Sequence, residues 1–152
     1  MSTEEVIRYL EEQHPGFEVG CGVVLKPQNH GATYVQYKQR LPGGTRGVHY
    51  EVEDDGQGCL AVELHVENDV PADIVAEVKK RIRSVRNNSK IIFYEKGCCL
   101  RCRASCKISP ERISMDRCIE ELSSRMNDLY AAFETELVEI ENIAREETRI
   151  DS

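Results

Sequence analysis

Residues 59–67, CLAVELHVE, show the strictest alternation of apolar and polar side chains in this chain of 152 residues. A period of two is typical of a β-strand with one buried face. The stretch 48–52, VHYEV, alternates in the same way, and the turn-forming sequence EDDGQG separates the two. These features predict an antiparallel hairpin with one face in the core and the other open to water or to a partner.

Similar patterns continue on both sides of this hairpin. Alternation predicts four more strands, over 17–25, 32–40, 90–95 and 99–108, and a turn over 27–31. Helical spacing predicts three helices: one that begins at Ser2 or Thr3 and ends near His14, one over 73–85, and a long one that Ser114 caps and that continues to Ala144.

The order α-β-β-β-β-α-β-β-α predicts an α+β fold, in which an antiparallel sheet of five to six strands has its helices on one face. The length favours one domain. We expect residues 1–133 to form this domain and residues 134–152 to be an extension of the C-terminal helix and a tail.

This order of elements resembles that of the type III secretion chaperone-like (YbjN-type) domains. It is also similar to the small α+β domain of unknown function that follows PD-(D/E)XK nuclease modules in some bacterial proteins. The resemblance covers residue 3 to about residue 146 and consists of element order alone. It implies a chaperone-like interaction domain, and it assigns a role to no individual residue because no family motif is matched.

Residues 95–109, EKGCCLRCRASCKIS, contain four of the seven cysteines. A zinc site usually draws on two close pairs of ligands, and only Cys99 and Cys102 have CxxC spacing. If this stretch is a strand, those two thiols point to opposite faces, and Cys98, Cys102 and Cys106 are spread over about 26 Å of one face. We therefore predict buried thiols without a metal or a cofactor; a zinc knuckle or a redox pair is the alternative.

Other candidate chemistry is sparse. A hairpin centred on Gly56 places His49 opposite Glu63, with His65 diagonal to it on the outward face, where the three could bind a metal or could simply be solvated.

The sequence has no GxSxG, no HExxH and no strand-borne D…ExK set, and the glycine-rich LPGGTRG lacks the Lys-Ser/Thr of a phosphate loop. We therefore predict that the chain is not an enzyme.

The charge distribution is uneven although the net charge is −7. Residues 79–107, here termed the basic island, contain ten Lys or Arg and one acid, Glu95. Such a segment attracts the phosphates of DNA or RNA, or else it is neutralised by acidic residues of its own fold or of a protein partner. The candidate nucleic-acid-binding residues are Lys79, Lys80, Arg81, Arg83, Arg86, Arg101, Arg103 and Lys107.

The predicted final helix is longer than the sheet is wide. Its apolar stripe covers about 45 Å at about 1.5 Å per residue, whereas six strands about 4.8 Å apart span about 24 Å. The second half should therefore extend beyond the sheet, and a second copy of the chain is the simplest cover for it. The dimer-interface candidates are Phe133, Leu137, Ile140 and Ala144. The alternative is a helix that bends near Glu134 and folds back over its own domain, or that frays.

The N-terminal stretch MSTEEVIRYLEEQ carries early acids and no apolar run, and eighteen consecutive apolar residues occur nowhere. We therefore expect a cytoplasmic, soluble protein that has reduced thiols and makes no contact with a membrane.

The missing catalytic motifs, the chaperone-like order of elements and the long amphipathic final helix favour a non-catalytic protein-interaction module, a homodimer that binds another protein. An accessory nucleic-acid-binding protein is the alternative.

Overall fold

A computed structural model describes residues 1–20, 22–30, 33–40, 46–69, 72–81, 89–94, 97–104 and 107–151. The described strands form one antiparallel sheet in the order β1-β2-β3-β4-β5-β7-β6. Their bounds are β1 Phe17–Val19, β2 Val23–His30, β3 Tyr34–Arg40, β4 Arg46–Asp54, β5 Leu60–Asp69, β6 Ser89–Tyr94 and β7 Gly97–Arg103. The helices are α1 Thr3–Gln13, α2 Val75–Arg81 and α3 Met115–Asp151, with short 3-10 turns η1 Ala72–Ile74 and η2 Pro110–Arg112.

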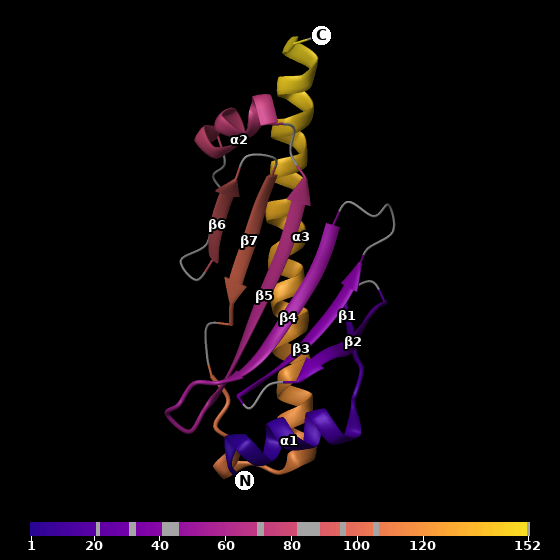
Figure 1. The fold of residues 1–152 in the computed structure, drawn as a ribbon, viewed down its shortest axis with the longest axis vertical. Helices are drawn as coiled ribbons and strands as arrows, with labels where there is room; N and C mark the ends of the chain where they lie inside the picture. The colour runs from indigo at the N-terminus through magenta and orange to yellow at the C-terminus, as the bar shows by residue number, and fades with distance from the viewer. Residues whose placement is uncertain are drawn as a thin grey trace.

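The helices lie on one side of the sheet (Figure 1). α3 runs behind the strands and contacts β1, β5 and β7, while α1 lies across one end and contacts β3 and β4. α2 packs on the part of α3 that continues past the sheet. The predicted α+β class, the antiparallel sheet and the long C-terminal helix are therefore confirmed. In the part of the chain that the structure describes, no helix covers the front of the sheet.

The core lies between the sheet and the two helices α1 and α3. Alternate residues of β4 and β5 point into it, as the period of two predicts. The Tyr50 hydroxyl reaches across the core and donates a hydrogen bond to the Met126 carbonyl of α3 at 3.2 Å. Other fully buried members include Val6 and Leu10 of α1, Val62 and Leu64 of β5, and Leu122 and Phe133 of α3.

The strand predicted over 17–25 is in fact two strands, β1 and β2, which pair with each other. The chain reverses through Gly20 and Gly22, which both have positive φ, at 54° and 84°. This conformation favours glycine. A β-carbon on Gly20 would also lie 2.1 Å from the ring of Tyr130, so the reversal is pressed against α3.

The turn predicted over 27–31 is wrong, because β2 continues to His30. Pro27 lies opposite Tyr37 of β3, and the register shifts between Pro27 and Asn29. A bulge and an edge position are the places where a strand tolerates proline. β1 pairs only with Val23–Leu25, so Pro27 lies beyond the paired part of β2 on that side.

The β4–β5 hairpin is present, but its predicted register is off by two residues. Tyr50 lies opposite Leu64 rather than Val62, and Val52 lies opposite Val62. The loop between Asp54 and Leu60 is centred on Gln57 rather than Gly56, and in it the Asp55 carboxylate accepts hydrogen bonds from the N–H groups of Gln57 and Cys59, at 2.7 and 3.0 Å. A shift of two keeps every side chain on its predicted face, although it changes each cross-strand partner.

α3 continues without a break through the predicted boundary at residue 133. Phe133 is 1% exposed in the main core, and Ile140 is 2% exposed in a second cluster with Ile74, Val78 and Ile143. Ala144 packs against that cluster, while the side chain of Leu137 lies outside the described part of the structure. The main core buries Phe133, and η1 and α2 of the same chain bury Ile140, so neither side chain needs a second copy of the chain as its cover.

β7 is shorter than the strand predicted over 99–108. It ends at Arg103, and the chain returns at Ile108, whose backbone exchanges two hydrogen bonds with that of Leu60, at 2.8 and 3.0 Å. Cys102 is 2% exposed, which agrees with the prediction of a buried thiol. Cys106 and the side chains of Cys98 and Cys99 lie outside the described residues. Within the described ranges, no helix has both the length and the apolarity needed to span a bilayer.

Candidate functional site

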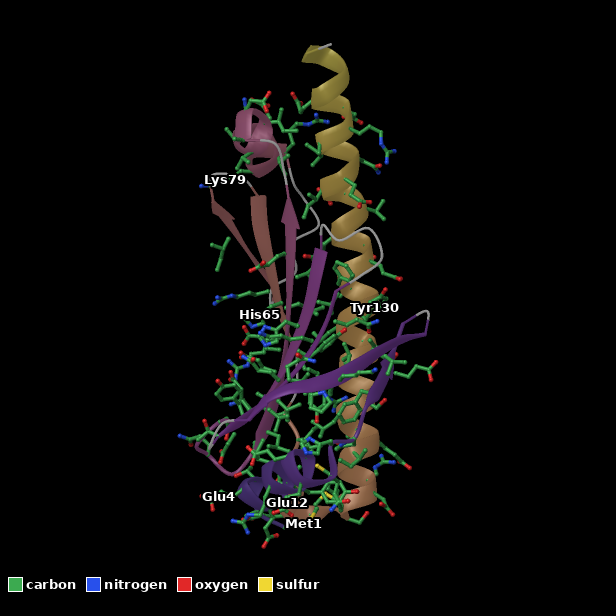
Figure 2. All side chains as sticks on the ribbon, turned by 45° about the vertical axis from the view of Figure 1, so that its right-hand side comes forward. Met1, Glu4, Glu12, His65, Lys79 and Tyr130 are labelled. Atoms are coloured by element: carbon green, nitrogen blue, oxygen red, sulfur yellow. The ribbon has the colours of Figure 1, made fainter. Side chains whose placement is uncertain are left out.

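The open face of the sheet carries a row of basic side chains that crosses the strands. Lys38 of β3 lies opposite His49 of β4, His49 lies opposite His65 of β5, and His65 lies opposite Arg101 of β7. We term these four residues the basic row. The register extends it at both ends, with Lys26 of β2 opposite Lys38 and Lys90 of β6 opposite Arg101. Figure 2 shows His65 on one side of the sheet, and Tyr130 of α3 on the other side.

The two histidines lie against each other at the centre of this row. Their ring centroids are 5.1 Å apart, with 32° between the ring planes. His49 Nε2 lies 3.5 Å from Glu51 Oε1, and His65 Nε2 lies 3.0 Å from Glu63 Oε1. Burial is the main reason that the pKa of His49 is lowered to about 4. The charges of His65 and Lys38 lower this pKa further, and the charge of Glu51 raises it in part. His49 is therefore neutral near pH 7.

An acidic cluster of Glu51, Glu53 and Glu63 lies next to the basic row. Glu51 and Glu63 are cross-strand partners, and Glu53 is the next outward residue along β4. A hydrogen bond with Glu51, together with burial and the charges of Glu51 and Glu63, raises the pKa of Glu53 to about 7. Burial alone would raise the pKa of Glu51, but hydrogen bonds from Glu53 and Gln36 and the nearby histidines lower it. The two β4 carboxyls therefore share a proton near neutral pH.

A cavity of about 510 Å³ opens over the basic row. Lys38, both histidines and Arg101 line it, together with the neutral side chains of Gln28 and Gln39 and the carboxylate of Glu67. Lys38 and Arg101 are exposed, so their charges are available to a ligand. The cavity can hold an anionic group between the two cations and beside the paired imidazole rings.

The predicted cluster of His49, Glu63 and His65 does occupy one face, but with a different partner for His49. The corrected register puts the two histidines opposite each other and pairs Glu63 with Glu51. Among the described residues, no group of three or more His, Cys, Asp or Glu side chains is arranged to hold a metal ion.

The basic island does not form a single surface in the described part of the chain. Arg101 and Arg103 are exposed on the open face, as predicted, whereas Lys79 and Lys80 are exposed on α2. Figure 2 shows Lys79 at a distance from His65. Arg83 and Arg86 lie outside the described residues.

Two other members of the basic island are held by acids of the same chain. Arg81 Nη1 lies 2.6 Å from Glu147 Oε1, and its other terminal nitrogen pairs with Glu146. Lys107 is not on a strand; its Nζ lies 2.9 Å from Asp55 Oδ2, and this hydrogen bond is the main reason that the pKa of Asp55 is lowered to about 2.

The sequence analysis missed Lys38 as a candidate, because it lies outside the basic island. The only available signal was its polar position in the alternating stretch 32–40. Its place beside His49 follows from the β3–β4 register, which residue spacing in one strand does not reveal.

Comparisons with protein-family models, with curated proteins and with solved structures found no match for this chain. The resemblance to type III secretion chaperone-like domains, and to the domain that follows PD-(D/E)XK nuclease modules, therefore stays a prediction.

Proposed function

We propose that this chain is a non-catalytic protein-interaction module that binds its partner on the open face of the sheet. One observation supports this best: the uncovered face carries a basic row directly beside an acidic cluster. Charges of both signs in one patch are typical of surfaces that recognise a protein partner, because they set register as well as attraction. The absence of any catalytic motif from the sequence supports a binding role.

The same observation argues against a broad nucleic-acid surface. A phosphate backbone presents negative charge at every nucleotide, so it favours a continuous positive groove. Here Glu51 and Glu63 lie on one side of the basic row, and Glu67 lies on the other. Single-strand binding also uses stacking aromatics. The register places Tyr34 of β3 on the open face, and it is the one tyrosine with a described side chain there.

Self-association through α3 is not part of this proposal. The apolar stripe of α3 favours it from sequence alone, but the main core covers Phe133 and residues of η1 and α2 cover Ile140 within one chain. The partner we propose is therefore a different protein.

Site-specific photo-crosslinking tests the proposed face. A photo-reactive amino acid replaces Glu67, which is exposed on the open face, or Glu120, which is exposed on α3, and each protein is irradiated in an extract of its source cells with or without nuclease. We expect a discrete protein adduct from position 67 only, unchanged by nuclease and lost when Arg101→Glu is added. An adduct removed by nuclease would favour the nucleic-acid alternative. Equal adducts at both positions, or none, would contradict the proposed face.

A further inference from the structure

The spacing of the basic row is set by the sheet, because the row runs across the strands. Neighbouring strands lie about 4.8 Å apart, so the three steps from Lys38 to Arg101 cover about 14 Å. The two histidines occupy the two strands between them. The row thus offers a cation at each end and a pair of imidazoles at the centre.

The charges beside the row make this site narrow. On one side, along β4, β5 and β7, lie Glu51, Glu63 and Arg103; on the other side lies Glu67. Of these four flanking residues, Glu51, Glu63 and Glu67 carry carboxylates, and Glu67 is exposed. A wide polyanion would therefore meet repulsion on both sides. A single chain that lies along the row would meet less repulsion, because its carboxylates would lie directly on the cations.

An extended peptide matches this geometry. Its same-side side chains repeat at about 6.6 to 6.8 Å, so residues i, i+2 and i+4 cover about 13 to 14 Å. That length equals the distance from Lys38 to Arg101 across three strand spacings. We propose that the basic row binds an extended segment of the partner protein in which acidic residues alternate with neutral ones, lying across the strands of the sheet.

Each carboxylate of such a segment has a chemically suitable contact. The first would meet the Lys38 ammonium, and the third would meet the Arg101 guanidinium, which can bind a carboxylate through two parallel hydrogen bonds. The middle carboxylate would lie beside the paired rings of His49 and His65, which attract it when they carry a proton, while their buried Nε2 atoms face Glu51 and Glu63. This inference rests on the proposed function, and it specifies the chemistry of the partner.

Binding of this kind takes up protons. His49 is neutral near pH 7 in the free chain, and a carboxylate beside it favours the protonated ring. Of the charged groups that face the histidines, Lys38, Arg101 and Arg103 oppose this protonation, while Glu51, Glu63 and Glu67 support it. The pKa of His49 in the free chain is about 4, so we expect the affinity for the acidic segment to rise as the pH falls from about 6 to about 5, where a ring beside a carboxylate begins to hold a proton.

Two synthetic peptides of identical composition test the spacing. One is Gly-Glu-Ser-Glu-Ser-Glu-Gly, with alternating acids, and the other is Gly-Ser-Glu-Glu-Glu-Ser-Gly, with contiguous acids. Fluorescence anisotropy with dye-labelled peptides on the full chain, at about 50 mM salt so that screening is modest, should show the alternating peptide binding at least about threefold more tightly. Equal affinities would overturn the proposal, because they would show that only total charge matters.

Two variants with the same change of charge test the location. Arg101→Gln removes one end of the basic row, and Lys79→Gln removes an exposed charge on α2. We expect Arg101→Gln to weaken binding of the alternating peptide about tenfold and Lys79→Gln to weaken it less than about twofold. Equal effects would mean unspecific attraction and would contradict the site.

Two further probes separate the other ligand classes and the two proposals. Tighter binding of a single-stranded oligonucleotide, or of a peptide with phosphoserine in place of glutamate, would overturn the preference for carboxylates. If the alternating peptide does not bind while the crosslink from position 67 persists, this inference fails and the protein-interaction function stands. If neither peptide binding nor the crosslink is observed, this inference and the protein-interaction function both fail.

Discussion

Two buried tyrosines differ in what their hydroxyl groups contact. The Tyr50 hydroxyl donates to the Met126 carbonyl at 3.2 Å, whereas the Tyr37 hydroxyl has no hydrogen-bond partner among the described residues. Burial raises the pKa of both far above the usual value for tyrosine, so both are neutral at all ordinary pH values. A buried hydroxyl without a partner destabilises the folded state by its lost hydration.

Tyr37→Phe should therefore leave the free energy of unfolding unchanged or raise it slightly. Tyr50→Phe should lower it by about 0.5 to 1.5 kcal/mol, because a buried hydrogen bond is lost. Urea denaturation of both variants beside the native chain measures the difference. Both variants keep an aromatic ring in place, so an equal loss of stability in the two would contradict the hydrogen-bond assignment.

The titration of Glu53 and His49 should affect stability in opposite directions. The folded-state pKa of Glu53 is about 7, above its ordinary value of 4.5, so its stabilising contribution is complete at low pH and is lost as the pH rises through 7. The folded-state pKa of His49 is about 4, below its ordinary value of 6.5, so burying the neutral ring is unfavourable below pH 6.5. The two effects oppose each other between these pH values.

We expect Glu53→Gln to become more stable relative to the native chain as the pH rises from about 5 to about 8. We expect His49→Gln to become more stable relative to the native chain as the pH falls from about 6.5 to about 4. Denaturant unfolding across this pH range tests both. Slopes of the same sign in the two variants would show that one of the assigned pKa shifts is wrong.

At the scale of the element, the reversal between β1 and β2 depends on two glycines with different surroundings. Gly20 has φ 54°, its N–H donates to Asn127 Oδ1 at 3.0 Å, and an added β-carbon would overlap the Tyr130 ring. Gly22 has φ 84°, and an added β-carbon would meet no described atom within 4 Å. The first position therefore combines backbone strain with a steric clash, and the second has strain alone.

Gly22→Ala should lower the free energy of unfolding by about 1 to 2 kcal/mol, which is the cost of a left-handed residue with a β-carbon. Gly20→Ala should lower it by about 1 to 3 kcal/mol more, because Tyr130 or the turn must move. Thermal and urea denaturation of the two variants measures this difference. Similar losses would mean that the turn does not press against α3.

At the scale of the whole molecule, pairs of opposite charge join segments that are distant in the sequence. Arg81 of α2 contacts Glu146 and Glu147 of α3, and Lys107 contacts Asp55 in the β4–β5 loop. The basic island is thus partly neutralised by the acidic segments before and after it. This is the arrangement that the alternative reading of the charge pattern predicted, and it leaves Arg101 and Arg103 exposed on the open face.

The full chain should be a monomer at micromolar concentration. Phe133 and Ile140 are buried in their own chain, and Val24 and Val138 are the large apolar side chains that the described residues expose, at 45% and 53%. Single exposed residues of this kind do not form a dimer interface. Light scattering after size exclusion measures the mass. A dimer that persists on dilution would contradict this expectation and would require an interface elsewhere.

Residue spacing determined most of the elements and the face that the side chains of β4 and β5 occupy. The alternation in 59–67 placed Val62 inward and His65 outward, and helical spacing predicted that the third helix is long. These properties are local, because the pleat of a strand and the turn of a helix repeat within a few residues. The exposure of Arg101 and Arg103 followed for the same reason.

Tertiary structure alone decided which residues meet. The pairing of His49 with His65 depends on a loop whose length Asp55 sets through its own hydrogen bonds. The reversal at Gly20 depends on the ring of Tyr130, and the burial of Ile140 depends on Ile74 and Val78. The contacts of Gly20 with Tyr130 and of Ile140 with Ile74 and Val78 join residues that are far apart in the chain. Their geometry follows from packing and chain closure, which a local pattern of residues does not encode.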